Sequence, residues 1–202
     1  SYNTLLAVLE KDAHGGLRIG GVYWGKIIWA IGAWQYQLWN DAPGFANLAL
    51  EAIENTLAEA EARELDPADG LFRGGACFQD GVAAYPDCFV SMKRGSGIMD
   101  YLSSPPPGAK IAPAGTGLPM KALSTNALYC AAYRIADRFR KVLGKQPAHQ
   151  ESAQALKDAV NSRFRNPATG TYRYLLDADD PNPERQEGLG HAFALLSGIV
   201  PE

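Results

Sequence analysis

Cysteine is scarce in this sequence, and its spacing excludes the common zinc sites. The chain of 202 residues has three cysteines, Cys77, Cys88 and Cys130, with no Cys-x-x-Cys pair and no histidine nearby. Because zinc needs closely spaced cysteine and histidine ligands, we expect no metal site. Cys77 and Cys88 share a segment and could pair. Free buried thiols are the preferred interpretation, and they favour a reducing compartment.

Long apolar runs and clusters of one charge are also absent. No segment reaches the roughly 20 apolar residues of a membrane-spanning helix. The first residues, SYNTLLAVLEKD, lack the basic start and the cleavage site of a signal peptide. Nineteen Lys and Arg residues and 22 acidic residues are spread along the chain, which gives a net charge of −3. We therefore expect no nucleic-acid or membrane partner, and a cytoplasmic location is favoured.

Strand-like alternation is nearly absent, and only Thr171–Leu176 has the pattern of a short strand. Helical patterns dominate instead, and the first residues resemble the end of a helix. Helices are expected at Trp24–Trp39, Phe45–Glu64, Leu123–Leu143 and Glu151–Phe164, and from Asn182-Pro183-Glu184 to about Ser197. The first of these is apolar on nearly all sides, which predicts an inner helix, whereas Phe45–Glu64 is amphipathic. We expect one all-α domain over residues 1–202, built of helical hairpins.

One short pattern, Ala-x-Gly-x-[aromatic or Leu]-Arg, occurs three times. The copies are Ala13–Arg18, Ala68–Arg73 and Ala168–Arg173, and each follows a helical segment, which predicts a structural repeat. Each copy opens a long connection from an outer to an inner helix, the longest being 68–122. If the inner helices are parallel, these connections emerge at one end of the molecule. Long loops at one end of a rigid scaffold are where functional sites are usually built.

Four stretches resemble the six-hairpin glycosidases, the glycoside hydrolases with an (α/α)6 toroid. They are WGKIIWAIGAWQYQLWND, GLFRGGACFQDGVAAYP, LSTNALYCAAYR and QEGLGHAFALLSGIVPE. The group includes trehalase-like, processing α-glucosidase-like, rhamnosidase-like and glycogen-debranching catalytic domains. Its toroid has twelve helices, and this chain has about six. The resemblance therefore implies a partial toroid, either a fragment or a chain completed by a second copy or by a missing half.

The resemblance implies two carboxyl groups that act as acid and base, about 6.5–9.5 Å apart in an inverting enzyme. Asp80 is the candidate acid, because it is the acid inside the apolar stretch Gly70–Asp87, between Phe78 and Tyr85. Desolvation there would raise its pKa. The alternative is that Asp80 caps a turn. Glu187 is the candidate base within the chain, and its alternative is a favourable interaction with a helix N-terminus.

The remaining candidates would bind sugar, since sugar sites combine aromatic platforms with fixed polar groups. They are Trp24, Arg73, Phe78, Tyr85, Lys121, Ser124, Thr125, Asn126 and Gln186. Other interpretations stay open: Arg73 braces a loop, as its counterparts in the repeat suggest, and the turn 124–126 caps a helix. Trp29, Trp34 and Trp39 are assigned to the core, and His191 to a satisfied core position.

The predicted function is that of a glycoside hydrolase of the inverting type, without a cofactor, acting on α-glucosidic or related oligosaccharides. Two alternatives compete with it. One is a sugar epimerase or lyase on the same toroid, although such enzymes usually rely on His or Tyr acid–base pairs. The other is a carbohydrate-binding half-toroid without catalysis.

Overall fold

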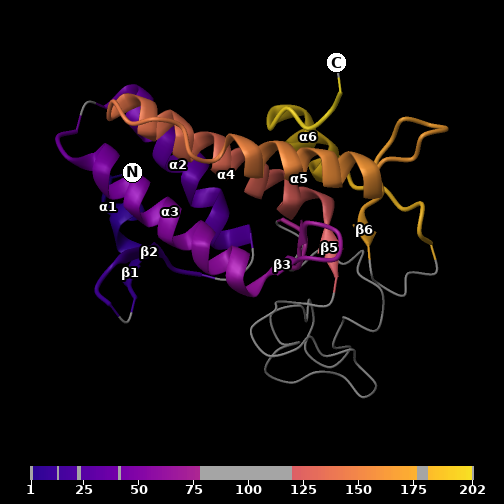
Figure 1. Cartoon of the computed structure of the whole chain (residues 1–202), viewed down its shortest axis with the longest axis horizontal. Helices are drawn as coiled ribbons and strands as arrows, with labels where there is room; N and C mark the ends of the chain where they lie inside the picture. The colour runs from indigo at the N-terminus through magenta and orange to yellow at the C-terminus, as the bar shows by residue number, and fades with distance from the viewer. Residues whose placement is uncertain are drawn as a thin grey trace.

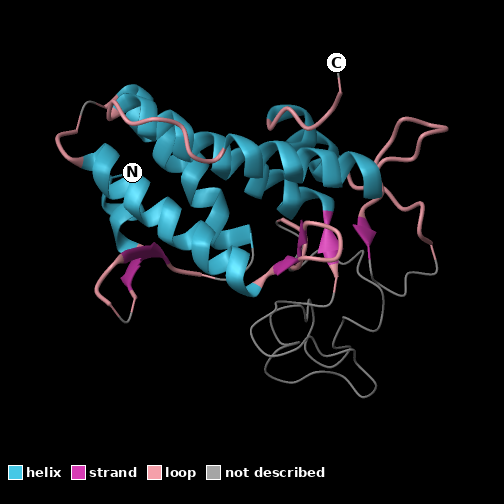
Figure 2. Ribbon diagram, in the orientation of Figure 1, coloured by secondary structure: helices cyan, strands magenta, loops and turns pink. Residues whose placement is uncertain are grey.

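Helices dominate the computed structural model, which describes residues 2–12, 14–21, 24–40, 42–77, 120–176 and 182–201. The six helices of this part are α1 (Tyr2–Ala7), α2 (Trp24–Trp39), α3 (Phe45–Arg63), α4 (Leu123–Val142), α5 (Gln150–Arg163) and α6 (Gly188–Leu196) (Figures 1 and 2). The short strands are β1 (Leu9–Lys11), β2 (Leu17–Ile19), β3 (Leu65–Asp66), β4 (Leu71–Phe72), β5 (Lys121–Ala122) and β6 (Leu175–Leu176). They form three antiparallel pairs, β1–β2, β3–β4 and β5–β6. The chain is therefore mostly helical, and the predicted all-α class omits these pairs.

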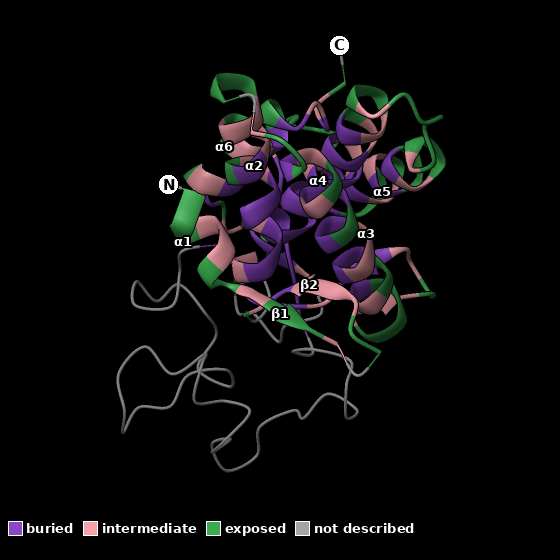
Figure 3. Cartoon of the chain, turned by 90° about the vertical axis from the view of Figure 1, so that its left-hand side faces the viewer, coloured by how far each residue is buried: buried purple, intermediate pink, exposed green. Residues whose placement is uncertain are grey.

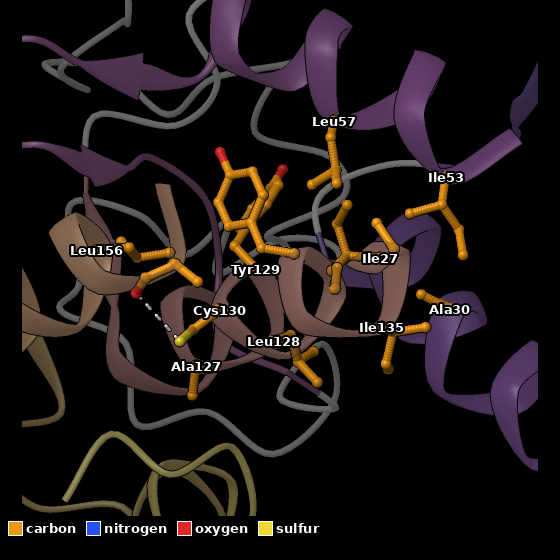
Figure 4. Packing of buried hydrophobic residues seen from close by; sticks show 14 of the residues in the cluster. Ile27, Ala30, Ile53, Leu57, Ala127, Leu128, Tyr129, Cys130, Ile135 and Leu156 are labelled. Carbon is orange, nitrogen blue, oxygen red and sulfur yellow. Dashed lines mark hydrogen bonds between the residues drawn. The ribbon is translucent and has the colours of Figure 1, made fainter. Parts of the chain in front are cut away.

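Helix α4 is the centre of the arrangement and packs against α2, α3, α5 and α6. In Figure 1, α2 and α4 run in one direction and α3 and α5 return in the other. The returns are short, at residues 40–44 and 143–149, as expected for antiparallel helical hairpins. Every residue from Leu123 to Cys130 is buried, because neighbours surround the first half of α4. Figure 4 shows side chains of this core between α2, α3 and α4.

Helix α2 is buried only on one side, which corrects the prediction of a fully surrounded helix. Trp29 is buried and Trp34 is half-buried, but Trp39 is 85% exposed and Leu38 is 58% exposed. The assignment of Trp39 to the core was wrong. A spacing of five residues rotates each successive ring by about 140° around the helix, so four rings cannot share one buried face. The exposed end of α2 contrasts with the buried interior in Figure 3.

Helix α6 begins later than its sequence signal predicts. Asn182, Pro183 and Glu184 precede it, and the first helical residue is Gly188. Instead, the N–H of Arg185 donates to the carbonyl of Asn182 at 3.1 Å and closes a turn. The carbonyl of Arg185 accepts from the N–H of Tyr174 at 2.7 Å, which ties this turn to the preceding chain. Glu187 then has extended backbone, with φ −127° and ψ 121°. Long-range pairing therefore overrides the local capping signal.

The predicted repeat is a structural one, and its second and third copies are hairpins of the same design. Asp66 Oδ1 accepts from the N–H of Ala68 at 3.0 Å, and Asn166 Oδ1 accepts from Ala168 at 2.9 Å. The N–H groups of Gly70 and Gly170 donate to the carbonyls of Asp66 and Asn166, each at 2.8 Å. Both glycines have a positive φ, at 72° and 73°, which explains why the pattern needs glycine there.

The described cysteines are buried thiols outside any disulfide, as expected. Cys77 and Cys130 are both fully buried, and burial raises the pKa of the Cys130 thiol. Its Sγ lies 3.6 Å from the carbonyl oxygen of Ala153. Cys88 lies outside the described residues. Both thiols therefore belong to the packed core rather than to a reactive surface.

Candidate functional site

The ends of several helices meet where α3 stops and where α2 and α4 start, and we call this region the loop end. Lys26 on the first turn of α2 faces Glu64 at the end of α3, and Lys121 just before α4 bonds to Asp66. The start of α6 is close as well, since a Cβ on Gly190 would lie 3.0 Å from the side chain of Leu123. The starts of α2, α4 and α6, which the three long connections precede, therefore lie together at this end.

Glu64 is a mostly buried carboxyl group with an incomplete set of partners. Its side chain is 13% exposed, and its Oε1 lies 4.0 Å from the ammonium nitrogen of Lys26, whose side chain is 9% exposed. Its Oε2 is buried and has no hydrogen-bond partner in the part of the chain that the structure describes. Burial raises the pKa of Glu64, although Lys26, Arg63 and Arg73 oppose the rise. Glu64 thus tends to hold a proton at a higher pH than an ordinary glutamate.

Tyr129 lies on α4 and contributes a second buried polar group. Its ring stacks on Phe72, with centroids 3.7 Å apart and planes 6° from parallel. Figure 4 shows the side chain directed from α4 toward the side where α3 lies. The side chain is fully buried, and within the described ranges its hydroxyl has no hydrogen-bond partner. Burial, followed by the charges of Glu64 and Glu59, raises the pKa of Tyr129 strongly, so the phenol stays neutral.

Arg73 and Lys121, both predicted to bind sugar, meet at the carboxylate of Asp66. Arg73 lies 2.6 Å and Lys121 lies 2.8 Å from Asp66 Oδ2, and Lys121 also bonds to Asp69 Oδ2 at 2.6 Å. The hydrogen bond from Lys121 is the main reason why the pKa of Asp66 is lowered. This partly buried ionic cluster ties the β3–β4 hairpin to the start of α4. The geometry matches the bracing interpretation of Arg73.

The turn Ser124–Asn126 holds the chain that follows β4. Ser124 Oγ accepts from the N–H of Cys77 at 2.9 Å, and Thr125 Oγ1 donates to the carbonyl of Gly75 at 2.5 Å. Asn126 accepts from the N–H of Phe72 at 2.8 Å and donates to its carbonyl at 3.0 Å. None of the three makes a side-chain hydrogen bond that caps α4. These polar groups serve the loop backbone, and their role in sugar binding stays a prediction.

Glu187 and Gln186 precede α6 and differ in exposure. Glu187 is 8% exposed and is the N-cap residue of α6, without a side-chain capping hydrogen bond. Gln186 is exposed, and its Nε2 donates to Thr171 Oγ1 at 3.2 Å. His191 is half-buried and satisfied, as predicted: its Nε2 accepts from the N–H of Tyr172 at 3.2 Å, and its Nδ1 lies 2.8 Å from the carbonyl oxygen of Glu187.

Trp24 is the first residue of α2, half-buried and packed against the core. Asp80, Phe78 and Tyr85 lie outside the described residues. The described residues contain no group of three or more His, Cys, Asp or Glu side chains that could hold a metal ion. None of the helices in this part of the chain combines the length and apolar character needed to cross a bilayer.

Sequence reasoning missed Glu64, Lys26 and Tyr129. Glu64 entered the sequence analysis only as the last residue of the amphipathic helix Phe45–Glu64 and was given no role. A signal was present, however, because Glu64 and Phe164 occupy equivalent positions in the second and third copies of the repeat. The second copy therefore has a carboxyl group where the third has an apolar side chain. Lys26 and Tyr129 carried no comparable signal.

The mostly buried pair of Glu64 and Lys26 can donate and accept hydrogen bonds and exchange a proton.

Comparisons with known proteins add no relative. No family model, no curated protein and no solved structure matches this chain.

Proposed function

We propose that this chain is a glycoside hydrolase that acts on oligosaccharides with α-glucosidic or related linkages. One observation carries the proposal: long connections between paired helices open at one end, and this end holds the carboxyl groups of Glu187, which is buried, and Glu64, which is mostly buried. Loops at one end of a rigid scaffold form concave sites, and acids with reduced exposure are suited to proton transfer. The helix order also supports the finer proposal of a partial (α/α) toroid, with α2, α4 and α6 as inner helices.

The proposed mechanism uses an acid and a base on opposite sides of the glycosidic bond. Asp80 is the proposed acid, from the sequence pattern alone, and would protonate the leaving oxygen. Glu187 is the proposed base and would activate water, which yields inversion of configuration. Its low exposure, at 8%, favours this role.

The test is hydrolysis of an α-linked gluco-oligosaccharide panel by the full chain, followed by NMR of the product anomers. We expect the variants Asp80→Asn and Glu187→Gln to lower turnover by about 10²–10⁴-fold, because each removes a proton-transfer group. Glu184→Gln is the matched control, since Glu184 is an exposed carboxylate in the same connection that pairs with Arg173 at 2.8 Å. Turnover within twofold of wild type in either test variant would remove that residue from the mechanism.

Binding without hydrolysis in the same panel would favour the carbohydrate-binding alternative, and calorimetry would detect it. Association with a second copy also stays a prediction. Exposed apolar side chains on α2 and α6, namely Trp39, Leu195 and Leu196, are surface that such association could bury. Light scattering on the purified chain measures the mass directly.

A further inference from the structure

The repeat provides an internal comparison for the loop end. Glu64 follows the last residue of α3 and Phe164 follows the last residue of α5, and each donates its N–H to the helix, to Ala60 and Val160 respectively. The carbonyl of Glu64 accepts from the N–H of Arg73, and that of Phe164 accepts from Arg173, both at 2.9 Å. Glu64 and Phe164 are therefore structurally equivalent.

The starts of α4 and α6, the helices that follow the two hairpins, are structurally equivalent as well. Asn126 is the fourth residue of α4 and binds the N–H of Phe72, while His191 is the fourth residue of α6 and binds the N–H of Tyr172. The two units thus share a helix end, a hairpin and a helix start. Differences between their side chains reveal what each unit does beyond folding.

The fold does not require a carboxyl group at position 64. Phe164 fills the equivalent position and is fully buried. A buried carboxyl costs several kcal/mol unless it is well paired, and an apolar residue of similar size is often as good or better for stability. Glu64 has a single ion-pair partner at 4.0 Å and one buried oxygen without a partner among the described residues. Stability therefore does not explain why Glu64 is there.

The partners of Lys26 also indicate a role beyond stability. It is 7% exposed overall, and in the described structure its ammonium has the Glu64 carboxyl as its ion-pair partner and forms no hydrogen bond. An ammonium has three N–H donors, which are left for another acceptor. Lys26 also lies two residues after Trp24 on the first turn of α2, at the end where the long connections open.

We propose that Lys26 and Glu64 form a subsite for a vicinal diol of a sugar. Each sugar hydroxyl both donates and accepts a hydrogen bond, so a diol needs a donor and an acceptor side by side. Lys26 supplies the donors and the carboxyl of Glu64 supplies the acceptor. This assignment rests on the proposed carbohydrate function and names the residues that anchor the sugar rather than those that cleave it.

The charged and titratable groups around Glu64 are known for each neighbouring element. They are Lys26 from α2, Glu59 and Arg63 from α3, Arg73 after β4, and Tyr129 from α4. Arg63 and Arg18 pair with Glu59, and Arg73 pairs with Asp66. Among the described residues, Lys26 is therefore the cation that pairs with Glu64, so the two can respond together to a ligand.

The experiment measures binding of maltose, maltotriose and trehalose to the full chain by calorimetry, and the KM and kcat for any sugar that is cleaved. The variants are Glu64→Phe, which copies the third repeat, Glu64→Gln and Lys26→Met. Glu59→Gln is the control, because Glu59 lies on the same helix and pairs with surface arginines. Thermal melting verifies that each variant is folded.

We expect Glu64→Phe and Lys26→Met to bind sugar at least tenfold more weakly and to raise KM more than they lower kcat. Glu64→Gln keeps an acceptor and should lose less, and Glu59→Gln should bind like wild type. If the wild type binds sugar and Glu64→Phe binds it equally well, the subsite is refuted and the proposed function stands. If the wild type binds none of the three sugars, the subsite and the proposed function are both overturned.

Discussion

Two tyrosines on α4 should respond in opposite ways, in folding stability, to substitution by phenylalanine. Tyr129 and Tyr133 are one turn apart on α4, and both are buried, at 0% and 2% exposure. The hydroxyl of Tyr133 donates to Glu61 Oε1 at 2.6 Å. The hydroxyl of Tyr129 is buried without a hydrogen-bond partner among the described residues. Replacing each with phenylalanine removes the same single atom from two different environments.

The magnitudes follow from hydrogen bonding. A buried polar group without a partner costs about 1–3 kcal/mol, and Tyr129→Phe removes that cost while the ring can still stack on Phe72 at 3.7 Å. Loss of the dispersion contacts of the hydroxyl oxygen reduces this gain by a few tenths of a kcal/mol. We expect Tyr129→Phe to stabilise the fold by about 1–2 kcal/mol. Tyr133→Phe should destabilise it by about 1–2 kcal/mol, because a hydrogen bond to a charged acceptor is lost.

The assay is urea unfolding of wild type and both variants, followed by circular dichroism, with thermal melting as a second measurement. For a chain of this length, 1 kcal/mol corresponds to about 2–4 °C in Tm, so the two variants should move Tm in opposite directions. A loss of 1 kcal/mol or more in Tyr129→Phe would refute the reasoning. It would mean that the Tyr129 hydroxyl has a good partner in solution.

Two further predictions concern the loop end. Burial raises the pKa of Glu64 above its ordinary value of 4.5. The protonated side chain therefore stabilises the folded state fully below pH 4.5, and this stabilisation is lost as the pH rises through the raised pKa. Glu64→Gln should therefore gain stability relative to wild type between pH 4 and pH 7, and an unchanged difference in unfolding free energy across this range would contradict the argument. Gly70→Ala should cost about 1–2 kcal/mol, because φ is +72° there while the new Cβ would meet only Ala159, at 3.7 Å. Gly25→Ala in α2, where the new Cβ meets nothing within 4 Å, should instead stabilise by about 0.5–1 kcal/mol, and equal effects of the two substitutions would refute the role of φ.

The helices were largely predictable because their signals are local. The predicted range Trp24–Trp39 agrees with α2 at both ends, and Leu123 was correctly predicted as the start of α4. Break residues such as Pro43 and Gly44, and the periodic apolar positions, act within a few residues of where they stand. The predicted start of α6 was wrong because it depends on a contact outside this local range. The backbone hydrogen bond between Tyr174 and Arg185 joins residues eleven positions apart, and the capping pattern at 182–184 does not contain it.

The candidate site was predictable only as a region. The three long connections identified the end of the molecule, and the structure brought Arg73 and Lys121 together there through Asp66. Side-chain roles within that region depend on neighbours from other helices, which a local pattern does not contain. Glu64 was therefore predicted only as the end of a helix.

By itself, the sequence determined the helices, the short returns between them and the glycine-dependent hairpin that repeats after α3 and α5. These follow from backbone preferences and periodicity within a few residues. Only the tertiary structure decided that Glu64 is buried against Lys26 and that Trp39 is exposed. Burial is a property of what packs around a residue, and residues 26 and 64 become neighbours only when α2 and α3 fold against each other.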